Sequence, residues 1–302
     1  MKDFRLHGNE NKILKINPTP LSPDGYRDGE GLGVRIMKIA IIGTGNLGLA
    51  IAKGLITNNA ITTLYMTRRN PATIESYAEY KNVFVTSDNL EAVQKSDILI
   101  FAVQPAQLAK ILHDIKDELT DKHVLISTIT GYAISQIEAI VGTDQFIIRA
   151  MPNTAIAVGA SMTCLASNEK GMKRIKVAEA IFNRLGNSLI IPENQMQAAT
   201  VVCASGIAFW MRLIRATTQA AIQLGFDAHE AQELAMHTCN GASKLLIESG
   251  NHPEEEIDRV TTPKGCTIEG LNEMEHKGLS SSLIQGMVAS FNKINVIKTD
   301  QK

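Results

Sequence analysis

The sequence predicts a doubly wound α/β domain at residues 37–192, followed by an all-helical domain at residues 193–302. In the first part, short apolar runs alternate with helical patterns, which is typical of a parallel sheet with crossover helices. The run at 96–103 is almost continuously apolar and is followed by Pro105, as expected of a strand buried on both faces of such a sheet. After residue 192 the strand patterns stop and long helical patterns follow.

The expected elements of the first domain follow one another in order. Apolar runs predict strands at residues 37–42, 61–66, 83–85, 96–103, 124–128, 146–151 and 162–165. Helical periodicity predicts helices at residues 49–56, 89–94, 108–115, 134–141 and 173–185. Because the helices join successive strands, we expect them to cover both faces of the sheet.

The second domain has more apolar helix surface than its own packing accounts for. Its expected helices lie at residues 194–224, 227–248, 267–275 and 283–294. Asp227 followed by Glu230 is a capping-box pattern that marks the start of the second of them. Residues 198–225 carry few charges. A homodimer, or a higher multiple of dimers, is the simplest way to bury this surface, so we expect a dimerisation domain.

The first strand runs directly into a G-x-G-x-x-G turn and then a helical pattern, which predicts a Rossmann-type dinucleotide site. Gly43 permits the tight turn, Gly45 the approach of a pyrophosphate, and Gly48 the packing of the helix on the strand. The helix start presents free N–H groups to the phosphates. The expected cofactor contacts here are Gly43, Thr44, Gly45, Asn46, Leu47 and Gly48. The alternative is a glycine-rich turn that holds no ligand.

The end of the second expected strand predicts which dinucleotide is bound. An Asp or Glu there would bind the ribose 2′-hydroxyl of NAD, but this chain has Thr67, Arg68 and Arg69. A hydroxyl and two guanidiniums suit a 2′-phosphate, because the planar fork of Arg donors matches phosphate oxygens. We therefore expect NADP(H) as the cofactor. The alternative is a solvated basic turn.

Composition argues against several other classes of function. The formal net charge is −1, so nothing indicates a nucleic-acid partner or a membrane surface. The four cysteines form no C-x-x-C pair and the seven histidines show no ligand spacing, so we expect no metal site and reduced thiols in a cytoplasmic protein. No uninterrupted apolar run reaches the length of a membrane span, since the longest, 201–211, contains Ser205 and Gly206.

Residues 1–36 differ from the rest of the chain. They are rich in Pro and Gly and low in hydrophobicity, with no run long enough for a signal-peptide core. Met37 opens the first expected strand. We therefore expect residues 1–36 to be a disordered or non-native leader.

Four segments in this order identify a family. They are the fingerprint turn, Ala102-Val103-Gln104-Pro105, residues 148–155 (IRAMPNTA) and residues 260–269 (VTTPKGCTIE). Together they resemble the Δ1-pyrroline-5-carboxylate reductases, which reduce a cyclic imine acid to proline with NAD(P)H, and the resemblance covers essentially everything from Met37 onward. The resemblance implies further cofactor contacts at Asn89, Ala102, Val103, Gln104, Pro105 and Thr128.

The chain departs from the family pattern mainly where the substrate is expected. Gln104 stands where the family has Lys, and Ala155 where it has Pro. Residues 203–209 (CASGIAF) stand where the family reads Ser-Gly-Ser-Gly-Pro-Ala-Tyr, so Ile207 replaces Pro. Lys264 replaces the first Gly of the Ser-Pro-Gly-Gly-Thr-Thr signature.

Imine reduction requires a placed hydride donor, a proton on nitrogen and a group that holds the substrate carboxylate. Because a cyclic imine is basic enough to arrive protonated, one hydroxyl that donates a hydrogen bond is sufficient. We expect Thr267 to supply it while capping its helix, and the N–H groups of Gly265, Cys266 and Thr267 to bind the carboxylate. The alternative is a structural cap without a ligand.

Two more residues are candidates for the substrate side. Asn153 follows a strand at the edge where α/β sheets bind ligands, although an ordinary Asn turn has the same pattern. Ser205 and Gly206 form a small pair that either lets the substrate ring approach the backbone or lets helices pack closely. The pair does not form G-x-S-x-G, which argues against a serine hydrolase.

Three functions are consistent with the sequence. The first is NADPH-dependent reduction of Δ1-pyrroline-5-carboxylate to L-proline, the last step of proline biosynthesis. The second is reduction of a related imine or keto acid on the same scaffold. The third is a non-catalytic NADP-binding regulatory protein.

Overall fold

The computed structural model describes residues 37–58 and 61–299, and the side chains of that part as far as Ile294. The leader expected at residues 1–36 lies outside this part of the chain. The described residues belong to one unit. The division expected after residue 192 therefore stays a prediction.

One eight-stranded sheet organises the first part of the chain, in the order β3-β2-β1-β4-β5-β6-β7-β8. The strands are β1 (Lys38–Ile42), β2 (Thr63–Thr67), β3 (Val83–Thr86), β4 (Ile98–Phe101), β5 (Val124–Ser127), β6 (Phe146–Met151), β7 (Ser161–Ser167) and β8 (Gly186–Ile190). Pairing from β3 to β6 is parallel, whereas β7 runs antiparallel to β6 and β8 runs parallel to β7. The expected strands are confirmed, and β8 was not predicted because its short polar sequence gives no apolar run.

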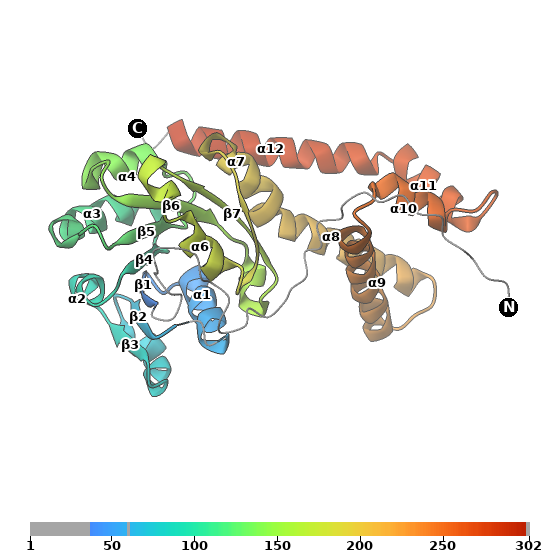
Figure 1. Ribbon diagram of the computed structural model, residues 1–302. Helices are drawn as coiled ribbons and strands as arrows, with labels where there is room; N and C mark the ends of the chain where they lie inside the picture. The colour runs from blue at the N-terminus through green and yellow to red at the C-terminus, as the bar shows by residue number, and fades with distance from the viewer. Residues whose placement is uncertain (1–36, 59–60, 300–302) are drawn as a thin grey trace, which may run out of the picture. The chain divides into compact units, whose positions relative to one another are not determined.

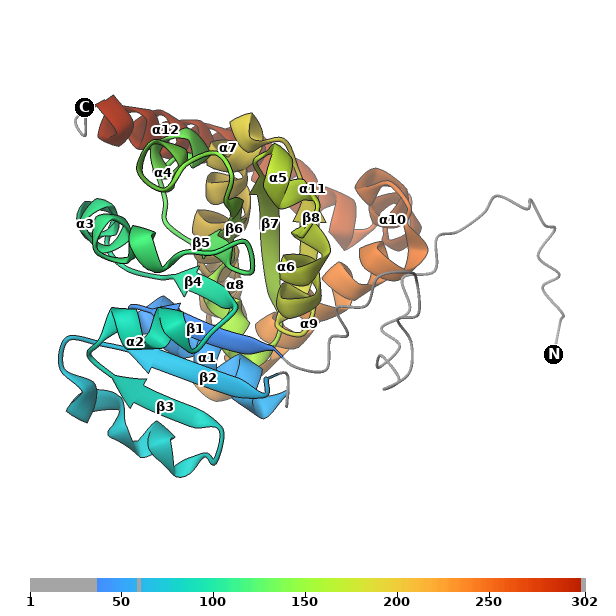
Figure 2. The same cartoon turned by 60° about the vertical axis from the view of Figure 1, so that its left-hand side comes forward.

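Helices cover both faces of the sheet, as expected for a doubly wound fold (Figures 1 and 2). One core cluster joins the sheet to α1 (Asn46–Thr57) and α6 (Ile175–Phe182). A second joins it to α2 (Asn89–Gln94), α3 (Pro105–Ile115) and α4 (Ile134–Val141). Neighbouring residues of β1 show the alternation: Ile41 belongs to the first cluster and Ile42 to the second. The buried strands are apolar on both faces for this reason.

Short helical turns complete the first part. They are η1 (Pro71–Glu79), η2 (Lys116–Glu118), η3 (Thr154–Val158) and α5 (Glu169–Met172). The helix expected at 173–185 is shorter than predicted, because Arg174 leaves helical geometry with φ −121° and ψ 6°. The chain therefore forms α5 and α6 as two separate helices.

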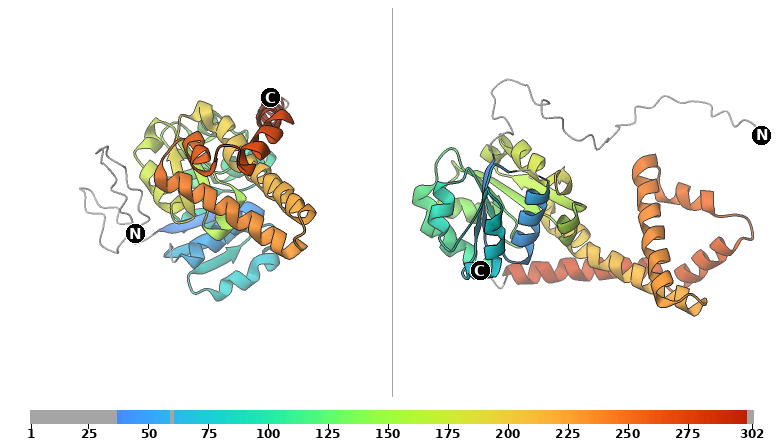
Figure 3. Two further views of the ribbon diagram at one scale, coloured as in Figure 1. Left: turned by 90° about the vertical axis from the view of Figure 1, so that its right-hand side faces the viewer. Right: turned by 90° about the horizontal axis from the view of Figure 1, so that it is seen from below.

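The described residues after 192 form helices joined by loops and contain no strand. The elements are η4 (Glu193–Gln195), α7 (Met196–Ala199), the π-helical turn η5 (Thr200–Ser205), α8 (Gly206–Gln223), α9 (Ala228–Ser249), α10 (Pro253–Val260), α11 (Cys266–His276) and α12 (Leu279–Thr299). α8 packs against α9, and α11 leads directly into the long helix α12 (Figure 3). Asp227 caps α9 as expected, accepting hydrogen bonds from the N–H groups of His229 and Glu230 at 2.8 and 3.0 Å. α10 was not predicted.

The helical part exposes large apolar side chains. Their exposed fractions are large, for example 56% for Trp210, 58% for Met211, 81% for Leu224 and 77% for Ile247. The run Glu193–Gln223 is long and apolar enough to cross a membrane by length and composition alone, and only 17% of its most apolar stretch is buried. The prediction from the sequence was that no such run exists, because Ser205 and Gly206 interrupt the apolar stretch there, whereas the average hydropathy of the run is high.

Candidate active site

Predicted cofactor residues follow four strands at one edge of the sheet. Gly43 follows β1, Arg68 follows β2, Ala102 follows β4 and Thr128 follows β5. These strands are parallel, so their carboxyl ends lie at the same edge. The strand order reverses at β1, whose neighbours are β2 and β4. Open α/β sheets bind ligands at such a switch point.

The three fingerprint glycines meet different steric demands. Gly43 has φ +93°, and a Cβ there would lie 2.3 Å from Cγ1 of Val103. A Cβ on Gly48 would lie 2.4 Å from the carbonyl oxygen of Gly43, so α1 packs directly on the turn. A Cβ on Gly45 would have no neighbour within 4 Å. The turn is therefore closed at its base and open at Gly45.

The open position fits a pyrophosphate group. Gly45 and Asn46 are exposed, and within the described residues the N–H groups of Asn46 and Leu47 donate to no backbone acceptor. Free N–H groups at a helix start bind anions. Thr44, in contrast, is fully buried and its N–H donates to the carbonyl of Thr67 at 2.8 Å. The accessible donors of this turn are thus those that follow Gly45.

The end of β2 lies against the same turn. The N–H of Gly43 donates to the hydroxyl oxygen of Thr67 at 3.2 Å, which explains a Thr at this position independently of a ligand. Arg68 is half-buried and its N–H donates to the carbonyl of Thr86, while Arg69 is exposed. Among the ion pairs of the described residues, neither guanidinium has a carboxylate partner. Both positive charges are therefore available to a phosphate.

The remaining expected cofactor residues surround this edge. Asn89 is half-buried at the start of α2, and the exposed Gln104 precedes α3, which begins at Pro105. Thr128 is buried, and its hydroxyl donates to the carbonyl of Phe101 at 2.8 Å. That bond ties β5 to β4, so the Thr128 side chain has a structural role here. The cofactor contacts of these residues stay predictions.

Asn153 and Ser205 are brought together from two parts of the chain. The Asn153 side chain accepts the N–H of Ala155 at 3.0 Å and donates to the carbonyl of Cys203 at 3.1 Å. Ser205 ends the same π-helical turn that contains Cys203. π-Helical turns occur often at functional sites. The ordinary Asn turn weighed from the sequence is thus present, and a substrate role for either residue stays a prediction.

The loop before α11 has an unusual backbone at a position where the sequence departs from the signature that it resembles. Lys264 has φ +59°, and it is the one non-glycine residue with positive φ in the described part of the chain. Its side chain is exposed. Gly265 follows as the N-cap, and a Cβ there would lie 2.4 Å from the hydroxyl of Thr262. A glycine at position 264 would remove the strain that Lys264 carries.

The expectation that Thr267 caps its helix is wrong. α11 begins at Cys266, so the cap position belongs to Gly265 and Thr267 lies inside the first turn. The Thr267 side chain is exposed, and its hydroxyl is not needed to hold the helix start. Within the described residues no hydrogen bond or ion pair joins the loop 261–267 to the fingerprint turn. Its roles in catalysis and carboxylate binding stay predictions.

We expect Lys264→Gly to stabilise the protein by about 0.5–1 kcal/mol. Left-handed geometry costs a residue with a side chain roughly 1–2 kcal/mol, and glycine avoids this cost. Glycine also gains freedom in the unfolded chain, which lowers the stability of the folded protein by roughly 0.5–1 kcal/mol. Denaturant unfolding would measure the difference. Lys264→Ala is the matched control, because it removes the charge and keeps the strain. Equal stability of the glycine and alanine variants would contradict this explanation.

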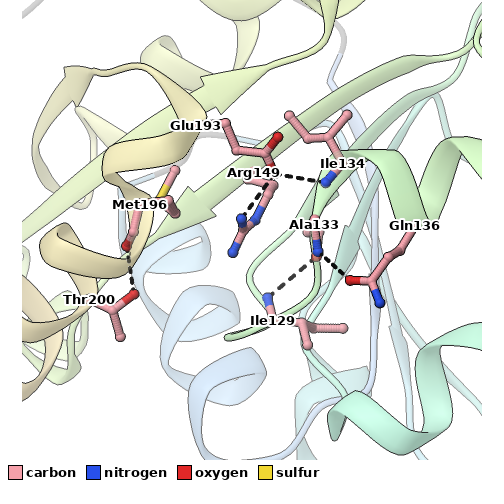
Figure 4. Close-up of polar contacts among 9 residues, drawn as sticks. Ile129, Ala133, Ile134, Gln136, Arg149, Glu193, Met196 and Thr200 are labelled. Carbon is pink, nitrogen blue, oxygen red and sulfur yellow. Dashed lines mark hydrogen bonds and ion pairs between the residues drawn. The ribbon is translucent and has the colours of Figure 1, made fainter. Parts of the chain in front are cut away.

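The ion pair between buried Arg149 and half-buried Glu193 could not be predicted from the sequence. Arg149 in β6 donates to a carboxylate oxygen of Glu193 at 3.0 Å, and the same oxygen accepts the N–H of Ile134 at 2.8 Å (Figure 4). The Arg149 side chain is 7% exposed. With Gly131 and Gln197 the pair lines a cavity of about 210 Å³. The pair links β6, α4 and the start of the helical part, and no sequence pattern relates its partners, which are 44 residues apart.

Two family models match the chain. Residues 193–296 match "Pyrroline-5-carboxylate reductase dimerisation", and residues 38–131 match "NADP oxidoreductase coenzyme F420-dependent". Pyrroline-5-carboxylate reductase 1 of Dictyostelium discoideum is 43% identical over 87% of this chain, which spans only 50% of that relative. Pyrroline-5-carboxylate reductase 2 of the same organism is 41% identical over 84% of this chain and 91% of its own length. The chain belongs to the pyrroline-5-carboxylate reductase family.

Solved structures of pyrroline-5-carboxylate reductases have the same fold. That of Coxiella burnetii is 29% identical with a TM-score of 0.80, covering 86% of this chain and 97% of its own. The NADP-bound pyrroline carboxylate reductase of Plasmodium falciparum is 25% identical with a TM-score of 0.77, and the match covers 87% of this chain and 98% of that protein's chain. These comparisons confirm the family and the fold predicted from the sequence. The exposed apolar helices belong to the part that matches the dimerisation model.

Proposed function

We propose that this chain is an NADPH-dependent Δ1-pyrroline-5-carboxylate reductase, which forms L-proline in the last step of proline biosynthesis. The observation that carries the proposal is that one chain combines an open dinucleotide turn at Gly45 with the dimerisation part of this family. Identity above 40% to relatives with this name supports the activity. The NADP-bound structure of a relative and the NADP oxidoreductase model support the predicted cofactor.

The residues of the sheet edge bind and orient the cofactor in this proposal. The N–H groups after Gly45 hold the pyrophosphate, and Arg68 and Arg69 pair with the 2′-phosphate. NADPH, when bound, supplies the hydride. On the substrate side, the N–H groups of Cys266 and Thr267 in the first turn of α11 hold the carboxylate, whereas the N–H of Gly265 donates to the carbonyl of Thr262 at 2.9 Å. The hydroxyl of Thr267 donates a hydrogen bond at the imine nitrogen.

The test of the proposal is NADPH oxidation by the full chain with Δ1-pyrroline-5-carboxylate and a panel of other cyclic imines and keto acids. We expect the highest kcat/KM with pyrroline-5-carboxylate. A clear preference for another imine or keto acid would instead favour the second function, reduction of a related substrate on the same scaffold. That alternative is suggested by the departures from the family pattern at Gln104, Ala155, Ile207 and Lys264. NADPH binding without turnover of any of these substrates would favour the regulatory protein.

The cofactor assignment predicts a selective effect of the two arginines. We expect Arg68→Ala with Arg69→Ala to raise KM for NADPH about tenfold or more, since a hydrogen bond to a charged group contributes ~1.5–3 kcal/mol. KM for NADH should hardly change. Arg68→Lys with Arg69→Lys is the control that keeps the charge but loses the planar fork. Its KM for NADPH should lie between that of the unmutated protein and that of the double alanine variant. An unmutated protein that uses both cofactors equally would contradict the assignment.

The protein is a homodimer, or a multiple of dimers, in this proposal. Exposed apolar residues of α8 and α9, such as Trp210, Leu245 and Ile247, supply surface for a second copy. We expect sedimentation at low micromolar concentration to give a dimer or a multiple of one. An active, well-behaved monomer would refute this. The dimer also accounts for the apolar run Glu193–Gln223 without a membrane, and the free cysteines agree with a cytoplasmic protein.

A further inference from the structure

Two thiols outside the predicted chemistry lie side by side. The Sγ atoms of Cys164 in β7 and Cys203 in η5 are 3.8 Å apart, although the residues are 39 positions apart in sequence. Both belong to a small apolar cluster that also contains Met151 and Met196. A disulfide needs about 2.05 Å between its sulfurs. Closing this pair therefore requires the two sulfur atoms to approach each other by less than about 2 Å.

The two thiols have different environments. Cys164 is 3% exposed, whereas Cys203 is half-buried. A hydrogen bond from the Cys164 thiol lowers the pKa of Cys203 to about 7. The same bond and burial raise the pKa of Cys164 above its ordinary value. Cys203 is thus suited to be the attacking thiolate, and Cys164 the shielded partner that resolves the product.

We propose that Cys203 and Cys164 form a dithiol that hydroperoxides oxidise to a disulfide, and that thiol reductants reduce again. The Cys203 thiolate attacks a peroxide oxygen, so that an S–O bond forms, the O–O bond breaks and hydroxide leaves. The sulfur of Cys164 then attacks Cys203, an S–S bond forms, and the sulfenic oxygen leaves as water with the Cys164 proton. Two thiols lose two electrons and two protons in total, and hydrogen peroxide becomes two waters.

The disulfide would act on the candidate substrate residues through the backbone. The carbonyl of Cys203 accepts the Asn153 side chain at 3.1 Å, and Ser205 follows two residues later in the same turn. Drawing Cys203 toward β7 displaces both groups. This step rests on the proposed function and on the prediction from the sequence that Asn153 and Ser205 contact the substrate. We expect the oxidised protein to lose at least about tenfold in kcat/KM for the imine acid, with KM for NADPH unchanged.

The test treats the full chain with hydrogen peroxide, stops the reaction with catalase and maps the cysteines by mass spectrometry. We expect one cross-linked peptide that joins Cys164 to Cys203 and that dithiothreitol reverses. In Cys164→Ser we expect no cross-link, and dimedone should label Cys203 as a sulfenic acid. Cys164→Ala is a second variant without the Cys164 thiol and should give the same result. Cys239→Ser is the matched control and leaves the cross-link intact. Two free thiols after peroxide, or a cross-link through Cys239 or Cys266, would overturn the proposal.

Activity is measured in the same samples before and after oxidation. If the reduced protein does not reduce pyrroline-5-carboxylate, the proposed function fails, while the mapped cross-link still decides the dithiol proposal. A complete cross-link with unchanged kcat/KM would overturn the coupling to the substrate residues. Loss of activity that peroxide still causes in Cys203→Ser would do so as well, because that variant forms neither the cross-link nor a sulfenic acid at position 203.

Discussion

Gly48→Ala is expected to abolish tight NADPH binding and to destabilise the protein. The added methyl would lie 2.4 Å from the carbonyl oxygen of Gly43 and 3.1 Å from Cγ2 of Ile41. The backbone of Gly43 cannot yield without opening the fingerprint turn. Overpacking of this kind costs ~1–3 kcal/mol, and each kcal/mol lowers Tm by roughly 2–4 °C in a protein of this size. Thermal unfolding and NADPH titration measure the two effects.

Gly45→Ala is the matched variant, because it separates cofactor binding from folding. A methyl at Gly45 meets nothing within 4 Å, and φ −81° at this residue is open to any side chain. We expect unchanged Tm but NADPH binding weaker by about 100-fold, equivalent to ~2.7 kcal/mol. The methyl takes the space in which the pyrophosphate approaches the turn. Normal NADPH affinity in Gly45→Ala would mean that the phosphates bind elsewhere.

Thr267→Ala is expected to lower kcat/KM for the imine acid by about 10- to 1000-fold. Thr267 is exposed in the first turn of α11, and Gly265 rather than Thr267 occupies the cap. Its hydroxyl is therefore free for the substrate, and its loss should change the free energy of unfolding by no more than ~0.5 kcal/mol. NADPH affinity should not change.

Thr267→Ser tests whether the hydroxyl itself is responsible. It retains the donor and should keep most of the activity, whereas a role of the methyl group in packing would impair both variants alike. Steady-state kinetics with varied imine acid, at saturating NADPH, makes the comparison. If kcat/KM of Thr267→Ala equals that of the unmutated protein, the loop has no part in the chemistry, and Asn153 and Ser205 become the main candidates for the substrate site.

The order of strands and helices, and the cofactor turn, could be predicted from the sequence. Those features depend on residues close together in the chain. Apolar runs mark strands that are buried on both faces, and the glycine at 48 is required by a contact within the turn itself. The cap at Asp227 is equally local, since it acts on N–H groups two and three residues later. The resemblance of ordered motifs then indicated the family.

Features that join distant segments emerge only in the folded chain. The antiparallel β7 and the polar edge strand β8 follow from pairing in the sheet, which a short sequence window does not express. The Arg149 to Glu193 ion pair and the contact of Cys164 with Cys203 span 44 and 39 residues. Such pairs depend on which strand ends lie beside which helix. Local residue patterns thus specify the elements and the cofactor turn, whereas the packing of those elements selects which side chains meet.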